Sequence, residues 1–411
     1  MSARDNMRTM RPLGGFSRFL IAGLAFLVVI GGGIAGYWAH RGHTSTSASR
    51  SAAGEIRAAS TSPGASATAS AADQSTARST SGAASGSTGG STPRSIPNFG
   101  NPAGHAYVPR AGRAVSVAHP DHIIGNGKPA SCTSRAVVRA VARGGVITFK
   151  CGPDPVTIMM TATATVSNSS HRVVLDGGGL VTLSGGGNRR ILYMKSGWEQ
   201  QFPHLIVQNI TFRDGYSATR QTQTSDYGGG AIFDEGGQLK VVNSRFIDNR
   251  CYAYGPDLGG AAIRAYGMDM SVPVYITNDT FRRNQCSNGA ALSGLYANFV
   301  VTNSLMSNNR AVGWGANPAA SGTRGGGSGG AVYTDGNSYN LVIAGTIMRY
   351  NTAREGGGAI FFVVNNGPGR LTIKSSRLHL NTSGAFQNAP GIFDSVDGHD
   401  TPPTVNRSVI N

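Results

Sequence analysis

The sequence predicts an all-β fold for residues 114–411, a right-handed parallel β-helix solenoid with a short N-terminal cap helix. Three observations predict it: an apolar motif that occurs six times, a glycine-rich motif that alternates with it, and two cysteines that hold the same place in successive repeats. Repeats of this length are typical of solenoids, in which each unit buries its apolar face against the next.

The apolar motif keeps a constant internal spacing. Its first copy contains Val207, Asn209 and Phe212, and the asparagine is replaced only in the last two copies. The large apolar position of the six copies is occupied by Phe212, Phe246, Phe281, Met306, Met348 and Leu378. In a parallel β-helix, each coil pairs with the next at about 4.8 Å. We therefore expect these side chains to stack in the interior.

A second asparagine follows the large apolar residue by three positions in every copy but the first. These asparagines are Asn249, Asn284, Asn309, Asn351 and Asn381. Asparagine tolerates the left-handed backbone conformation, and its amide can bond to backbone groups. We expect them to form a ladder at one bend of the coils. Asn288 lies outside the motif, and we place it in a more exposed turn.

The glycine-rich motif indicates a tight corner, because glycine lets the backbone bend with little side-chain bulk. Its copies are residues 229–232, 259–262, 329–332 and 357–360, with 288–291 as a weaker copy. No stretch within the repeats has the length and period of a helix. The variable spacing between motifs indicates loops of different length on a constant coil.

The repeat predicts a disulfide between Cys251 and Cys286. Cys251 lies two residues after Asn249, and Cys286 lies two residues after Asn284. The two cysteines therefore hold the same position in successive coils. One coil rise fits the Cα separation that a disulfide needs, about 4.4–6.8 Å.

The other two cysteines frame the predicted cap. Cys132 and Cys151 flank a short helical segment at 134–143 and the strand at 146–149 that follows it. We expect them to form a disulfide that ties a cap helix to the first coil. A solenoid needs such caps because its terminal coils are otherwise open to solvent.

The N-terminal third has a different organisation. We expect residues 1–18 to be a cytoplasmic N-terminus and residues 19–38 to be a transmembrane signal anchor, because an arginine-rich flank precedes an uncharged apolar run. A cleaved signal peptide is the alternative, and both export the rest of the chain. Residues 39–113 are rich in Ser, Thr, Ala and Gly and predict a disordered linker. The expected location is the cell membrane, single-pass, with the folded domain extracellular.

The charge of the chain bears on its partners. The net charge is +16, and residues 114–411 carry 25 basic and 17 acidic side chains, a net +8. No basic stripe with interleaved aromatic residues is present, so we exclude nucleic acid as a partner. An acidic polymer such as a polyuronate or teichoic acid fits a moderately basic surface. The alternative is that the positive charge is spread over the surface and serves no particular partner.

The repeats resemble known families. The alternating glycine-rich and apolar motifs are similar to the repeats of chlamydial-type polymorphic outer membrane proteins. The segment 173–186, with Asp176 followed by three glycines, resembles the pectin-lyase-like β-helix superfamily. The resemblance covers about residues 130–400 and implies the fold; since that fold carries lyases, hydrolases and adhesins, it does not imply one function.

One set of charged residues is a candidate catalytic site. Asp214 and Asp248 both lie two residues after the repeat phenylalanine, and Arg283 takes this position in the next coil. Two carboxylates about 5 Å apart suit a retaining glycosidase. They also suit a calcium ion, and the resemblance to pectate lyases implies a cation beside an arginine base. An exposed ladder, in which Arg283 offsets the acid repulsion, is the alternative. We otherwise expect no metal and no cofactor.

Aromatic residues favour recognition of sugars. The most variable segments are 216–227, 252–258, 310–328 and 352–355, and we expect them on one side of the solenoid. They carry the candidate ligand-binding residues Tyr216, Tyr227, Tyr252, Tyr254 and Trp314. Solenoids commonly bind along such extended surfaces. Each ring packing against its own loop is the alternative.

These observations lead to two hypotheses about function. The first is a monomeric, membrane-anchored binding or adhesin-like module for a cell-wall or acidic polysaccharide, held to the membrane through the N-terminal anchor. The second is a polysaccharide lyase or glycoside hydrolase of the pectin-lyase-like fold. The sequence favours the first, because only one carboxylate pair is placed for catalysis.

Overall fold

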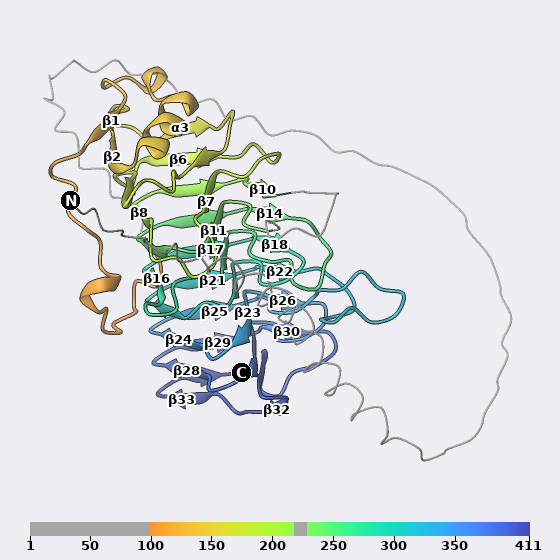
Figure 1. The fold of residues 1–411 in the computed structure, drawn as a ribbon. Helices are drawn as coiled ribbons and strands as arrows, with labels where there is room; N and C mark the ends of the chain where they lie inside the picture. Colours follow the sequence, from red (N-terminus) through yellow and green to blue (C-terminus); the bar gives the residue numbers. More distant parts are fainter. Residues whose placement is uncertain (1–98, 218–227) are drawn as a thin grey trace, which may run out of the picture. The chain divides into compact units, whose positions relative to one another are not determined.

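The computed structural model describes residues 99–217 and 228–411, which form stacked coils of parallel strands (Figure 1). Four sheets run along the stack, named here A to D. Sheet A runs in the order β1 (His122–Ile124), β2 (Gly145–Phe149), β5 (Arg172–Asp176), β8 (His204–Gln208), β12 (Gln238–Val242), β16 (Val274–Thr277), β20 (Phe299–Thr302), β24 (Asn340–Ala344), β28 (Arg370–Lys374) and β33 (Thr404–Asn406). Sheet B runs in the order β3 (Val156–Met159), β6 (Val181–Ser184), β9 (Thr211–Arg213), β13 (Arg245–Ile247), β17 (Thr280–Arg282), β21 (Leu305–Ser307), β25 (Ile347–Arg349), β29 (Arg377–His379) and β34 (Val409–Ile410).

The other two sheets complete each coil. Sheet C runs in the order β4 (Ala164–Thr165), β7 (Leu192–Lys195), β11 (Ile232–Glu235), β15 (Ile263–Tyr266), β19 (Leu292–Leu295), β23 (Val332–Asn337), β27 (Ile360–Asn366), β31 (Ile392–Val396) and β32 (His399–Asp400). Sheet D runs in the order β10 (Tyr216–Ser217), β14 (Arg250–Cys251), β18 (Gln285–Cys286), β22 (Arg310–Ala311), β26 (Thr352–Ala353) and β30 (Thr382–Ser383). A coil therefore passes from sheet C through A, B and D, and a loop returns it to C. The predicted right-handed parallel β-helix is confirmed.

The interior is built by the residues that the apolar motif predicts. Phe212 pairs in register with Phe246, which pairs with Phe281. Their rings are fully buried and stack with centroids 5.2 and 4.9 Å apart. Met306, Met348 and Leu378 continue the row. Burying side chains of this size contributes about 1.5–3 kcal/mol each, so the row is a main source of the stack's stability.

The asparagine ladder is also present. Asn284 Nδ2 donates to Asn309 Oδ1 at 2.9 Å and to the Phe246 carbonyl at 3.1 Å. The ladder continues through Asn351 to Asn381 with the same geometry. Each amide thus bonds to the next coil and to a backbone carbonyl, which satisfies buried polar groups at the bend between sheets B and D.

The cap helix α3 (Ser134–Arg143) begins after Thr133, whose Oγ1 accepts from the Ala136 amide, and ends at Gly144, which has a φ of +78°. The Val137 and Val141 side chains are fully buried. They belong to the same apolar cluster as the first coils, so α3 covers the end of the core. Two short 3-10 helices precede α3, namely η1 (Arg110–Gly112) and η2 (Pro129–Ser131).

Both predicted disulfides are present. Cys132 and Cys151 join the segment before α3 to the chain that follows β2, with Cα atoms 5.7 Å apart. Cys251 and Cys286 join β14 to β18 with Cα atoms 4.7 Å apart. The second bridge therefore links successive coils at one position, as the repeat predicts.

The predicted positions of two glycine-motif copies, 259–262 and 288–291, are wrong by one residue. Strand register aligns Gly229 with Gly260, Gly289, Gly329 and Gly357, which lie three residues before the paired positions Ile232, Ile263, Leu292, Val332 and Ile360. All five glycines have φ between +45° and +70°. The copies are therefore 260–263 and 289–292. The required feature is one left-handed glycine at the corner, and the extra glycine at 259 obscured its position.

The placement of Asn288 in an exposed turn is also wrong. Its side chain is fully buried. Its Nδ2 donates to the carbonyls of Pro256 and Leu258 at 2.6 and 3.0 Å, and its Oδ1 accepts from the Ser328 amide at 2.9 Å. Asn288 thus joins two loops that cover it.

The predicted N-terminus (1–18) and anchor (19–38) lie outside the described residues, as does the part of the predicted linker up to residue 98. From residue 99 onward the chain contacts the coils. The Gly100 amide donates to Thr280 Oγ1, and the Val115 amide donates to Gln208 Oε1, both at 2.9 Å. Within the two described ranges, no helix has the length and apolarity to cross a membrane.

Candidate functional site

The predicted carboxylate pair lies on the surface in a ladder of ion pairs. Asp214, Asp248 and Arg283 follow β9, β13 and β17, each with a left-handed backbone. Arg283 donates from Nε and Nη2 to the two Asp248 oxygens at 2.7 and 2.6 Å. Arg213 Nε donates to Asp214 Oδ2 at 2.8 Å. The hydrogen bond to Asp248 raises the pKa of Arg283. Each acid therefore has an arginine partner within the chain. This arrangement fits the alternative of an exposed ladder in which arginine offsets the repulsion between the acids.

The predicted aromatic residues that the structure describes lie in sheet D or in the loops after it, and they differ in exposure. Tyr216 lies in β10 and is half-buried. Tyr252 packs on the apolar cluster around the Cys251–Cys286 bridge, and its ring lies edge-on to Tyr254 at 6.0 Å. Tyr227 lies outside the described residues. Trp314 is 46% exposed.

Two of these rings are paired with arginines. The Arg324 guanidinium lies over the Tyr254 ring, 5.1 Å from its centroid. The Arg354 guanidinium lies over the Trp314 ring at 5.3 Å. Both arginines are exposed. We name the loops 252–258, 312–328 and 354–356, which connect sheet D to sheet C, the loop corner. It therefore presents two arginine–aromatic pairs with exposed arginines, in which the Trp314 ring is exposed and the Tyr254 ring is half-buried.

Beneath the loop corner lies a cluster of buried polar groups on the outer face of sheet C. Strand register places Arg264, Ser293 and Tyr333 in one row. Arg264 is 3% exposed, and its Nη1 donates to Ser293 Oγ at 2.7 Å. The Tyr333 hydroxyl donates to Asp335 Oδ2 at 3.1 Å. Asn317, from the loop above, donates to Asp257 Oδ1 at 2.6 Å.

The cluster holds two carboxyl groups with raised pKa values. Burial, followed by the negative charge of Asp257, raises the pKa of Asp335 to about 7. The surrounding protein also desolvates Asp257 and raises its pKa, although the residue is exposed at the edge of the cluster, and the charge of Arg264 opposes this shift. Such a pair suits general acid–base chemistry. Asp335 and Tyr333 are, however, 5% and 0% exposed beneath the loop that carries Asn317, which shields them from a polymer.

A further aromatic group flanks the same face. The turn after β7 carries Trp198, which is 40% exposed. Its ring lies edge-on to Tyr266 and Tyr296, at 5.2 and 4.8 Å. Neither this group nor the acid cluster was predicted from the sequence, because their members belong to no motif and come together only when the coils stack. A lone exposed tryptophan in a turn was the one available signal.

No family model matches the chain, and no curated protein or solved structure matches it. Among the described residues, no group of three or more His, Cys, Asp and Glu side chains is arranged to hold a metal ion.

Proposed function

We propose that the chain is a surface-displayed module that binds an acidic polysaccharide or cell-wall polymer at the loop corner. The observation that carries this proposal is a pair of exposed arginines over aromatic rings, Arg324 over Tyr254 and Arg354 over Trp314. Arginine matches a carboxylate or phosphate with two parallel hydrogen bonds. An aromatic ring adds a flat apolar surface for the sugar. The combination suits a polymer whose units carry both a sugar ring and an acidic group.

The broader setting of the chain supports this function. The net charge of +8 over residues 114–411 attracts polyanions at long range. We infer that the chain is a monomeric member of the pectin-lyase-like superfamily with repeats of the polymorphic-membrane-protein type. We further infer that residues 19–38 anchor it in the membrane and that the linker extends the β-helix into the extracellular space.

The acid cluster supports a second candidate function, a polysaccharide lyase or glycoside hydrolase. Asp335, with its raised pKa, has the protonation that a general acid needs near neutral pH. Catalysis would require the loop that carries Asn317 to move away, since the acid lies beneath it. Because the exposed groups of the loop corner need no such movement, binding without cleavage is the better supported function.

The test uses the full chain, solubilised in mild detergent, with polygalacturonate as the probe. We expect binding that weakens as salt screens the charges, without release of reducing ends or unsaturated products, in buffers with and without calcium. Release of products that disappears in Asp335→Asn would overturn the binding function and establish the enzyme. Release that disappears in Asp248→Asn would instead assign the chemistry to the exposed carboxylate pair.

A further inference from the structure

The segment 99–113, named here the strap, crosses the bend between sheets A and B, whereas the loop corner lies between D and C. Asn101 anchors the strap through its Nδ2, which donates to the Gly345 carbonyl at 2.8 Å. Farther along, the Ala106 amide donates to Asn303 Oδ1 at 2.8 Å, and Asn303 Nδ2 donates to the Ala106 carbonyl at 3.0 Å. The strap is thus held by its own Asn101 side chain and by the Asn303 side chain of the coils.

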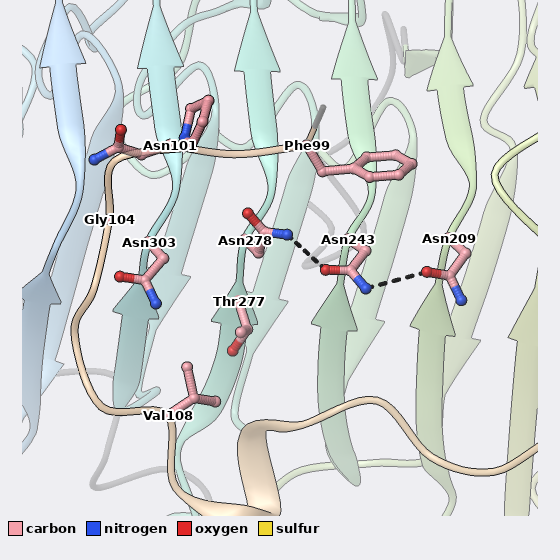
Figure 2. Close-up of a pocket in the computed structure, with 10 residues that line it drawn as sticks. Phe99, Asn101, Gly104, Val108, Asn209, Asn243, Thr277, Asn278 and Asn303 are labelled. Carbon is pink, nitrogen blue, oxygen red and sulfur yellow. Dashed lines mark hydrogen bonds between the residues drawn. The ribbon is translucent and has the colours of Figure 1, made fainter. Parts of the chain in front are cut away.

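A pocket of about 660 Å³ lies between the strap and the bend, within the size range of small-molecule sites, about 300–1,000 Å³. Figure 2 shows the row of asparagines beside the strap, with Phe99 at the start of the strap and Val108 farther along it. The pocket is lined by Phe99, Asn101, Pro102, Gly104, Val108, Asn209, Asn243, Thr277, Asn278 and Asn303. None of these side chains is charged, so the pocket suits a neutral ligand.

The row of asparagines is ordered by hydrogen bonds along the stack. Asn278 Nδ2 donates to Asn243 Oδ1 at 2.7 Å, and Asn243 Nδ2 donates to Asn209 Oδ1 at 3.1 Å (Figure 2). Each amide nitrogen carries two hydrogens, and the row uses one of them. The side chains are half-buried, so the row holds fixed, partly accessible donors.

The same bend already bonds the backbone of the strap segment through side-chain carboxamides, with the N–H and the C=O coming from successive peptide groups. Asn303 pairs with both the N–H and the C=O of Ala106, and Gln208 pairs with the N–H and the C=O of Val115, at 2.9 Å each. Between these two pairings the strap leaves the row open. Phe99 borders the opening, and the Arg245 guanidinium lies 4.5 Å from its ring centroid. The opening thus combines amide donors and acceptors with one aromatic ring.

We propose that this pocket binds a neutral sugar unit that carries an acetamido group, an N-acetylated hexosamine. The acetamido group pairs with the open asparagine row, and the sugar ring lies against Phe99. Hydroxyl groups, which donate and accept, match the remaining amide and Thr277 hydroxyl groups. The inference does not depend on the proposed function, because the site lies at another corner and none of its lining side chains is charged.

The test titrates the full chain with N,N′-diacetylchitobiose, with cellobiose as the probe that lacks acetamido groups. We expect saturable binding of the first and none of the second. Asn243→Gly removes an amide at a residue with φ of +50°, where glycine adds no strain, and should weaken binding about tenfold, as for one lost hydrogen bond. Phe99→Ala, which changes only the strap, should weaken it similarly.

Two variants serve as controls. Asn308→Gly makes the same chemical change at an exposed left-handed asparagine outside the pocket, with φ of +57°, and Trp314→Ala changes the loop corner. Both should bind diacetylchitobiose like the parent. Equal binding of cellobiose, absence of binding, or unchanged affinity in both Asn243→Gly and Phe99→Ala would overturn the proposal. Loss of diacetylchitobiose binding in Trp314→Ala would overturn it too. Polygalacturonate binding is measured in a separate titration and tests only the proposed function.

Discussion

The side-chain amide of Asn249 donates to Oδ1 of Asn284 at 3.0 Å, and the same oxygen accepts the Asn249 backbone amide at 3.0 Å. The two residues are 35 positions apart in sequence and belong to successive coils. One carboxamide thus fixes the register of two coils at a fully buried bend. Loss of this group leaves several buried partners unpaired.

Asn284→Leu should therefore lower the free energy of unfolding by about 1–3 kcal/mol for each buried group left unpaired. Asn288→Leu should have a comparable effect, because its amide bonds to three loop carbonyls. Asn340→Leu, at an exposed position of β24, is the matched control and should change stability little. Denaturant midpoints measure all three. Equal midpoints for Asn284→Leu and Asn340→Leu would contradict a ladder that stabilises the fold.

The Cys251–Cys286 bridge closes 35 residues. Closing a loop of this length in the unfolded chain stabilises the folded state by about 4 kcal/mol at 25 °C. The double variant Cys251→Ser/Cys286→Ser should unfold at a lower denaturant concentration, while retaining the β-rich circular dichroism spectrum, because the coils also pair through strands. Non-reducing peptide mapping of the parent should recover Cys251 with Cys286 and Cys132 with Cys151. A Cys151–Cys251 peptide would contradict the coil register.

Asp394 makes stability depend on pH. Burial raises its pKa to about 7, so the folded state retains a proton that the unfolded state releases near pH 4. Because the folded state binds more protons between about pH 4 and 7, this group lowers the free energy of unfolding as pH rises through that window. Asp394→Asn removes the effect. The stability difference between variant and parent should grow from pH 4 to 7 and then stay level; a constant difference would show that the pKa is not raised.

Asp248 and Arg283 form an exposed pair, and such pairs are worth about 0–1 kcal/mol. Asp248→Asn should therefore change the free energy of unfolding by no more than that amount. It should also leave polygalacturonate binding unaltered, because the pair lies outside the loop corner. A binding loss without a stability change would show that this ladder contacts the ligand.

Much of the fold can be predicted from the sequence because identical residues at a fixed offset identify coil positions. Phe212, Phe246 and Phe281 stack as the spacing predicts, and the cysteine pairing follows from the same register. Local composition predicts the position of a corner less reliably. The extra glycine at 259 moved the predicted corner of that coil by one residue from Gly260. The burial of Asn288 depends on loops that close over it, and no motif encodes that closure.

The candidate site was predicted less completely. The loops that carry Tyr254 and Trp314 both follow sheet D, as expected, because the repeat returns each of them to the same position in its coil. Their arginine partners were not predicted, since Arg324 and Arg354 approach the rings through loop conformation. Asp257 and Asp335 meet only because Asn317 and Tyr333 bring a loop against sheet C. Contacts of this kind have no sequence period.

The most direct test of the proposed function compares two charge-matched variants of the full chain in a titration with polygalacturonate at low salt. Arg324→Ala/Arg354→Ala removes the guanidinium groups that stack on the loop-corner rings, and Arg370→Ala/Arg377→Ala removes two exposed arginines from sheets A and B. Lost charge-assisted contacts are worth about 1.5–3 kcal/mol each. We predict at least a tenfold loss of affinity, which is about 1.4 kcal/mol, in the first variant and affinity close to the parent's in the second. Equal losses in the two variants would contradict a specific site and attribute binding to net charge alone.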